Sequence, residues 1–114
     1  EGDKRILLFD GEPVGAVMRI PTEKDHRGNM HVGARVETTE LSERDVQICR
    51  VLAPHLKKHD MVFVGIDVIG TWLTEINHTS PTGIREINRL YGMKLEAELV
   101  DCVEQRVAGT LEGV

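Results

Sequence analysis

Two pairs of strand-length apolar runs constrain the fold of this chain more than any other feature. The first pair covers Arg5 to Phe9 and Pro13 to Ile20, with the turn Asp10-Gly11 between them. The second pair covers Met61 to Val68 and Thr71 to Ile76, across a tight glycine turn. Runs paired in this way predict two antiparallel β-hairpins. The run from Met61 to Val68 is apolar throughout, which is typical of a strand buried on both faces.

Three helices are expected around these hairpins. Ser42 and Asp45 form a capping signal ahead of an apolar pattern of helical period, which Pro54 interrupts. A short helix from Ile84 to Tyr91 and a last one from Leu95 to Val107 complete the chain. The order of hairpin, loop, helix, hairpin and two helices predicts an α+β fold, with an antiparallel sheet and helices packed on one face.

The composition indicates one domain, spanning residues 1–114, and excludes several classes of function. A formal net charge of −5 argues against a nucleic-acid surface. The longest apolar runs are of strand length, so no membrane span is expected, and no secretory signal is visible. Cys49 and Cys102 are predicted to be free thiols. A cytoplasmic location is the expectation.

Oxygen-bearing side chains mark the second hairpin. Glu75 and Asn77 alternate onto the same face of their strand, and Asp67 lies on the preceding strand. Such hard oxygen donors suit Mg²⁺ held against nucleotide phosphates. The alternative is a pair of solvated strand residues beside a turn, and the residues alone leave both interpretations open.

Arginines mark the first hairpin. Arg5 begins it and Arg19 ends it, so antiparallel pairing would let both guanidinium groups meet one anion. The alternative is two solvated charges at strand ends. Arg27 and Arg35, with Gly28 and Gly33 between them, lie in the polar stretch that follows, which is either a loop that closes over an anionic ligand or simply a loop.

A polar segment precedes the short helix. Ser80 and Thr82 lie where backbone N–H groups at a helix start would cradle an anion or carboxylate, and Arg85 follows one turn into the helix. Helix capping by either hydroxyl is the alternative. The chain carries no Walker A pattern, dinucleotide glycine fingerprint, nucleophile elbow or zinc signature, so a nucleotide site here would be half a site.

Taken together, these segments resemble the bacterial glutathione synthetases, a branch of the ATP-grasp ligases. The resemblance is collinear over nearly the whole chain and rests on Gly2-Asp-Lys-Arg-Ile-Leu-Leu-Phe-Asp-Gly-Glu-Pro-Val14, Arg19-Ile-Pro21, Arg27-Gly-Asn29, Phe63-Val-Gly-Ile-Asp-Val-Ile-Gly70, Leu73-Thr-Glu-Ile-Asn77 and Thr79-Ser-Pro-Thr-Gly-Ile-Arg-Glu86. It implies the C-terminal half of an ATP-grasp domain, with the upstream half and an N-terminal substrate domain absent.

The resemblance also implies an activity. The family joins γ-glutamylcysteine to glycine, using ATP to form an acyl phosphate that glycine's amine attacks. By position, Asp67, Glu75 and Asn77 would be ligands of Mg²⁺ (or Mn²⁺), and Arg19 and Arg5 would hold the transferring phosphoryl group. A lid and substrate region would comprise Arg27, Gly28, Asn29, Gly33, Arg35, Ser80, Thr82 and Arg85. The resemblance further implies a homo-oligomer in the complete enzyme and an inactive fragment on its own.

Two alternatives remain open from the sequence. One is another ATP-grasp carboxylate–amine ligase, such as one that adds glutamate to a peptide or protein. The other is a non-catalytic fragment that acts through protein contacts.

Overall fold

The structure, a computed structural model, describes residues 2–21, 34–78 and 83–112. Within these ranges the elements follow in the order β1 (Asp3–Phe9), β2 (Glu12–Pro21), β3 (Ala34–Thr38), α1 (Glu43–Lys58), β4 (Phe63–Ile69), β5 (Trp72–Asn77), α2 (Ile84–Tyr91) and α3 (Leu95–Glu112). Both predicted hairpins and all three predicted helices are present.

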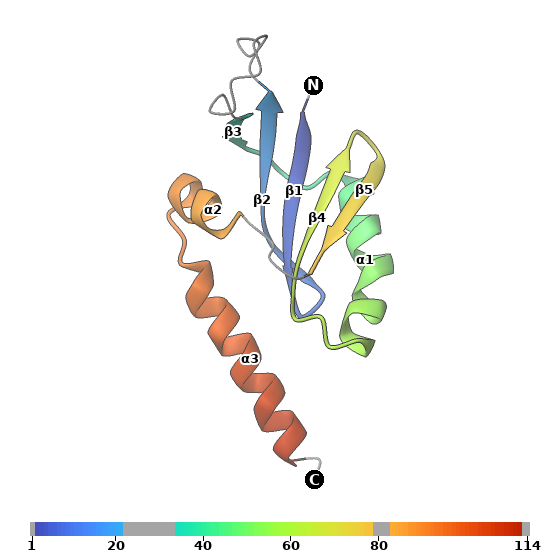
Figure 1. Cartoon of the computed structure of the whole chain (residues 1–114), viewed down its shortest axis with the longest axis vertical. Helices are drawn as coiled ribbons and strands as arrows, with labels where there is room; N and C mark the ends of the chain where they lie inside the picture. Colours follow the sequence, from blue (N-terminus) through green and yellow to red (C-terminus); the bar gives the residue numbers. More distant parts are fainter. Residues whose placement is uncertain (1, 22–33, 79–82, 113–114) are drawn as a thin grey trace.

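The five strands form one antiparallel sheet in the order β3-β2-β1-β4-β5 (Figure 1). Strand β1 lies at the centre, and its residues Ile6, Leu7, Leu8 and Phe9 are fully buried. The turn between β1 and β2 has positive φ at both Asp10 and Gly11, as the predicted tight hairpin turn requires. The α+β class and the antiparallel sheet are confirmed.

Helices cover both faces of the sheet, so the expectation that they lie on one face is wrong. Ile6 and Leu8 pack with Ile48 and Leu56 of α1 on one face. Leu7 and Phe9 alternate to the other face, where they pack with residues of α2 and α3. In Figure 1, α1 accordingly lies on one side of the sheet and α2 and α3 on the other. The central strands are apolar on both faces for this reason.

Helix α1 begins with the predicted capping box. The Asp45 backbone N–H donates to Ser42 Oγ at 3.1 Å, and the Ser42 backbone N–H donates to Asp45 Oδ2 at 2.8 Å. The same carboxylate oxygen accepts from Lys4 Nζ on β1, at 2.5 Å. The helix continues past Pro54 to Lys58. The cap therefore also ties the start of α1 to the central strand.

Strand β3 was not expected from the sequence. It is five residues long and lies at the edge of the sheet against β2, with Val36 opposite Arg19. Val36 of this strand packs against the core, between the exposed charges of Arg35 and Glu37. A short half-exposed strand of this kind carries little apolar alternation, which is the signal that identifies strands in a sequence.

The remaining sequence expectations concern thiols and membranes. Cys49 is buried, Cys102 is half-buried, and both are free thiols, as predicted. Burial raises the pKa of the Cys49 thiol to about 11, so it stays protonated at neutral pH. No helix in the described ranges is long and apolar enough to cross a membrane.

Candidate functional site

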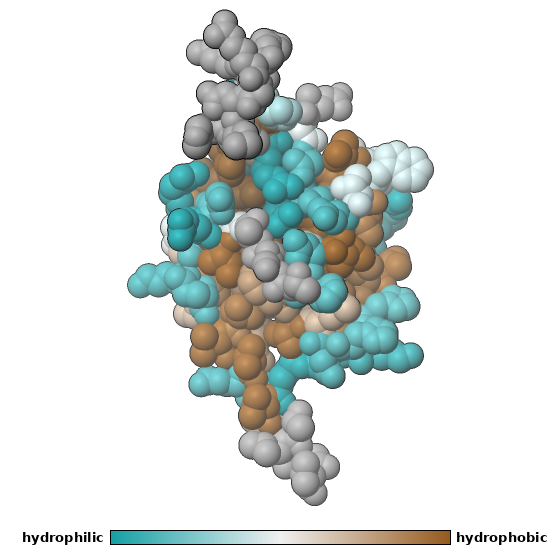
Figure 2. All heavy atoms as spheres, viewed as in Figure 1, coloured by the Kyte–Doolittle hydropathy of each residue, from teal (hydrophilic) through white to brown (hydrophobic). Residues whose placement is uncertain are grey.

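Strand register places three predicted site residues in one row across the sheet. Arg5 on β1 is the cross-strand partner of Asp67 on β4, and Asp67 is the partner of Glu75 on β5. The row lies on the same face as Leu7 and Phe9, because alternate residues of a strand share a face. It crosses the sheet near the start of β1, the upper end of the sheet in Figure 1. Figure 2 shows hydrophilic residues gathered over this upper part of the strands.

The centre of the row is a buried, two-point ion pair. Arg5 Nε donates to Asp67 Oδ1 at 2.5 Å, and Arg5 Nη2 donates to Asp67 Oδ2 at 3.1 Å. Arg5 is 5% exposed and Asp67 is 6% exposed. Two parallel bonds fix both the position and the plane of the guanidinium group. A charged pair this deep in the sheet requires both partners, because either one alone would be an uncompensated buried charge.

A second arginine reaches the same carboxylate. Arg19 Nη2 lies 3.2 Å from Asp67 Oδ1 and also bonds to Asp3 Oδ2. Arg5 and Arg19 thus converge on one carboxylate, the protein's own Asp67, and their expected contact with a phosphate stays a prediction. Asp3 was missed in the sequence, although its place opposite Arg19 in the hairpin register was the signal that could have identified it.

The charges of this cluster shift the pKa values of Asp67 and Arg19. Burial by itself raises the pKa of the Asp67 carboxyl, but the hydrogen bonds and charges of Arg5 and the charge of Arg19 outweigh burial and hold it below its usual range. The hydrogen bond from Arg19 to Asp3, opposed by desolvation and reinforced by the negative charges of Asp3 and Asp67, raises the pKa of the Arg19 guanidinium. The Asp67 carboxylate and the Arg19 guanidinium are therefore both ionised at neutral pH.

Glu75 and Asn77 extend the row toward solvent on the edge strand β5. Glu75 is exposed and lies opposite Asp67 in the strand pairing, while Asn77 is half-buried opposite Gly65. The strand pairing shifts register between Asp67 and Val68, where Thr74 Oγ1 donates to the Asp67 carbonyl oxygen at 3.1 Å. The irregularity still leaves Glu75 beside Asp67, as the predicted donor set needs.

These donors fit a divalent cation in their chemistry. Two carboxylates held as cross-strand neighbours repel one another when both are ionised, and a bound divalent cation would offset that repulsion. The described ranges hold no cluster of three His, Cys, Asp or Glu side chains suited to a metal, so the third protein donor would be the amide oxygen of Asn77. Carboxylate and amide oxygens are the ligand types that Mg²⁺ takes.

Other predicted residues lie elsewhere or outside the described ranges. Arg35 on β3 pairs with Glu37 at 2.7 Å on the face opposite that of Val36, so the structure does not bring it to the row. Arg85 is exposed in the first turn of α2. Arg27, Gly28, Asn29, Gly33, Ser80 and Thr82 lie outside the described residues.

The start of α2 lies directly against the row. The N-cap of α2 is Gly83, with φ of 129° and no side-chain capping bond. A Cβ built on Gly83 would lie 3.4 Å from Arg5 Cγ and 3.5 Å from Leu7 Cδ1. Glycine therefore suits both the backbone conformation and the close contact here. Gly83, at the start of α2, consequently lies next to Arg5.

Comparison with known proteins gives the same family that the motifs suggest. A model of the prokaryotic glutathione synthetase ATP-grasp domain matches residues 1–92. The glutathione synthetase of Thermosynechococcus vestitus is 59% identical over 100 residues, which are 88% of this chain and 31% of that protein. That of Agrobacterium fabrum is 55% identical over 106 residues, which are 93% of this chain and 33% of that protein.

A third relative extends the pattern. The glutathione synthetase of Gloeobacter violaceus is 60% identical over 101 residues, covering 89% of this chain and 31% of that protein. The chain thus spans about a third of the length of the curated relatives it matches. Given the family match over most of its length, this chain belongs to the prokaryotic glutathione synthetase family and carries part of its ATP-grasp domain.

Proposed function

We propose that this chain supplies the metal- and phosphate-binding part of a glutathione synthetase, an ATP-dependent ligase that joins γ-glutamylcysteine to glycine. The observation that carries the proposal is the row Arg5–Asp67–Glu75, joined by Arg19, on one face of the sheet. Cations and oxygen donors are placed side by side there, which is what phosphoryl transfer asks of a protein. The relatives are named glutathione synthetases, which supports the reaction that the resemblance implies.

The two arginines would act on the transferring phosphoryl group. Arg5 is fixed by two bonds to Asp67, so its guanidinium enters the reaction already oriented. Arg19 is held between Asp3 and Asp67 and is more exposed than Arg5. A phosphate oxygen that competes with Asp67 for Arg19 would gain a charge-assisted hydrogen bond where negative charge develops. Arg19 is therefore the group that would contact the phosphoryl group.

The metal would be held at the end of the row formed by Glu75 on β5, away from Arg5 on β1. Glu75 and Asn77 would be its ligands together with Asp67, as the sequence pattern predicts. When bound, Mg²⁺ or Mn²⁺ would neutralise charge on the ATP phosphates. Because Asp67 also binds Arg5, this one carboxylate would contact both the metal ion and the Arg5 guanidinium group.

Three further expectations belong to the same proposal. The segment of residues 20–35, including Arg27, Gly28 and Asn29, would act as a lid that keeps water from the acyl phosphate. The segment of residues 80–85 would contact the peptide substrate, which is consistent with the contact of Gly83 with Arg5. The complete enzyme would be a cytoplasmic homo-oligomer. The alternative ligase reaction is not favoured, since the relatives named above are all glutathione synthetases.

The experiment uses this chain joined to the preceding polypeptide that its longer relatives contain. Phosphate release from ATP is measured with γ-glutamylcysteine and glycine, each alone and both together. We expect release only with both, loss of at least about 10³-fold in kcat for Glu75→Ala, and unchanged kcat for Glu43→Gln. Glu43 is a matched control because it is an exposed glutamate on α1, on the other face of the sheet. Release that survives Glu75→Ala, or that does not need glycine, would contradict the proposal.

A further inference from the structure

The hydroxyl group of Tyr91, the last residue of α2, joins three elements of the fold. Tyr91 Oη accepts from the Thr39 backbone N–H at 2.9 Å. It also lies 2.9 Å from the carbonyl oxygens of Thr39 and of Ala16 on β2, which share its one proton. Thr39 directly follows β3. One side chain therefore ties the end of α2 to β2 and to the end of β3.

These bonds lie where the β2–β3 ladder stops. The last pair of the ladder sets Val17 opposite Thr38, so the same register continued by one residue would set Ala16 opposite Thr39. The Tyr91 hydroxyl lies between the two backbones at that position, accepting from Thr39 and donating to Ala16. The hydroxyl thus holds the end of an edge strand that has few apolar contacts of its own.

Helix α2 touches the sheet at two further points on the same side as Tyr91. Gly83 lies against Arg5, since a Cβ built on it would be 3.4 Å from Arg5 Cγ. Ile87 is fully buried against Gly15 of β2, where an added Cβ would lie 2.9 Å from Ile87 Cγ2. Residues four apart share one side of a helix. Figure 1 shows α2 beside β2 and β3. The helix therefore spans from Arg5 to the end of β3.

The first turn of α2 depends on these contacts for its position. The helix has only eight residues, fewer than the roughly 12–15 that an isolated helix needs to be stable in water. The Ile87 backbone N–H donates to the Gly83 carbonyl oxygen at 2.9 Å, which joins the two contact points by one helical turn. A displacement at Tyr91 is therefore passed along the helix to Gly83.

We infer that Tyr91 is a positioning residue for the peptide substrate of the proposed ligase. Its hydroxyl fixes the far end of α2, and so sets where the start of α2 lies beside Arg5. The inference rests on the proposed function, in which the start of α2 contacts that substrate. Arg5 is held independently by its two bonds to Asp67, and the metal ligands of β5 lie at the opposite edge of the sheet from β3. Loosening α2 therefore affects the peptide and not ATP.

Tyr91→Phe tests the inference, in this chain joined to the further polypeptide that its longer relatives contain. The change removes the hydroxyl and keeps the ring, so its hydrogen bonds are lost without a cavity. We expect the KM for γ-glutamylcysteine to rise about fivefold or more, with kcat and the KM for ATP within about twofold of the parent. A merely structural role would reduce the amount of folded enzyme and leave both KM values unchanged.

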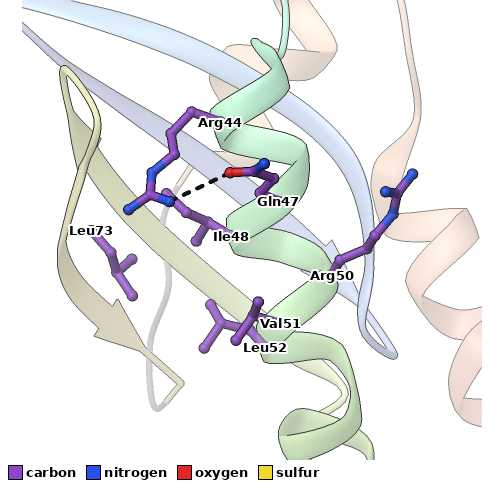
Figure 3. A pocket seen from close by; sticks show the side chains of 7 residues that line it. All are labelled: Arg44, Gln47, Ile48, Arg50, Val51, Leu52 and Leu73. Carbon is purple, nitrogen blue, oxygen red and sulfur yellow. Dashed lines mark hydrogen bonds between the residues drawn. The ribbon is translucent and has the colours of Figure 1, made fainter.

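Arg44→Met is the matched control, because it also removes a bond from a side chain to a distant backbone carbonyl. Arg44 Nε donates to the Thr71 carbonyl oxygen at 3.0 Å. Figure 3 shows Arg44 on the side of α1 that faces Leu73 of β5, and α1 lies on the face of the sheet opposite the row. We expect this variant to keep the parent values of kcat and of both KM values.

Amide hydrogen exchange gives a second readout that does not require turnover. In Tyr91→Phe, exchange should become faster at Thr39, whose N–H loses its acceptor, and at Ile87 in the first turn of α2. Circular dichroism confirms that parent and variants are equally folded. Unchanged exchange at Ile87, or an unchanged KM for γ-glutamylcysteine in an active variant, would overturn the inference. A folded parent that does not join γ-glutamylcysteine to glycine would instead overturn the proposed function, and the inference with it.

Discussion

At the residue scale, the site depends on one carboxylate that serves two arginines. Asp67 accepts both bonds of Arg5 and also contacts Arg19, and it is buried, whereas its cross-strand partner Glu75 is exposed. The two acidic residues were assigned the same role from the sequence, yet they differ in environment. Asp67 is part of the folded core, and Glu75 is available to a ligand.

This difference predicts opposite effects on stability. Asp67→Asn leaves the Arg5 guanidinium buried without its ionic partner, so we expect the free energy of unfolding to fall by about 3 kcal/mol. Glu75→Gln alters an exposed side chain and is expected to change it by less than about 0.5 kcal/mol. Urea denaturation of both variants measures these values. Equal losses for the two variants would show that Glu75 belongs to the structural core as well.

The sequence identified Arg5, Arg19, Asp67 and Glu75 but not the bonds among them. The hairpin turn fixes the register of β1 against β2, which is why the convergence of the two arginines was predictable. The register of β4 against β1 is set by no turn, because β3 and α1 intervene in the chain. The pairing of Arg5 with Asp67, 62 residues apart, is therefore a property of the tertiary structure.

At the element scale, the start of α1 is joined to the central strand by one charged contact. Asp45 is 1% exposed and accepts from Lys4 and from the Ser42 backbone through Oδ2, while its Oδ1 has no hydrogen-bond partner. Burial raises the pKa of the Asp45 carboxyl, but the hydrogen bonds from Lys4 and Ser42 outweigh this effect and lower it. The capping box was predictable from local sequence, whereas the bond to Lys4 was not.

The lowered pKa of Asp45 predicts how stability depends on pH. A carboxyl with a lowered pKa in the folded state contributes stability that is fully present above its unfolded pKa of about 3.9 and is lost as the pH falls through the folded value. We expect Asp45→Asn to reduce the free energy of unfolding at pH 7. The difference from the parent chain should shrink below about pH 4. Thermal unfolding of the variant and the parent chain at pH 7 and below about pH 4 measures this difference in the free energy of unfolding. A difference that stays constant with pH would contradict the account.

Two expectations about elements failed for physical reasons. Among the described side chains of β3, Val36 is the one apolar residue that packs against the core, which is too few for a period to be recognised. The helices were placed on one face although the run from Met61 to Val68 already predicted burial on both faces of its strand. That burial is observed, since Val64 and Ile66 face α1 while Phe63 packs with the α2 and α3 cluster.

At the scale of the whole molecule, α3 is attached to the rest of the fold by a charged clasp near its middle. Arg106 reaches Asp10 in the β1–β2 turn and Asp60 in the turn before β4. Both aspartates have positive φ, so each lies at a tight bend of the chain. The clasp thus joins the last helix to two turns that are far from it in the sequence.

Arg106→Ala is expected to loosen α3 more than it weakens the whole fold. The pairs are partly exposed, so the free energy of unfolding should fall by no more than about 1 kcal/mol. Amide hydrogen exchange after residue 102 should become faster, because the clasp is absent in the variant and α3 can open locally without breaking it. Arg89→Ala, at an exposed position of α2, is the matched control. Unchanged exchange in α3 of the Arg106 variant would show that apolar packing alone holds this helix.

The central claim is that Asp67, Glu75 and Asn77 bind a divalent cation beside Arg5 and Arg19, the arginines that hold phosphate. Electron paramagnetic resonance of Mn²⁺ tests it most directly, in this chain joined to the further polypeptide that its longer relatives contain and with a nonhydrolysable ATP analogue present. The account predicts that Glu75→Gln weakens Mn²⁺ binding by at least about tenfold, whereas Glu43→Gln leaves it unchanged. Equal Mn²⁺ affinity in the parent protein and the Glu75 variant would contradict it.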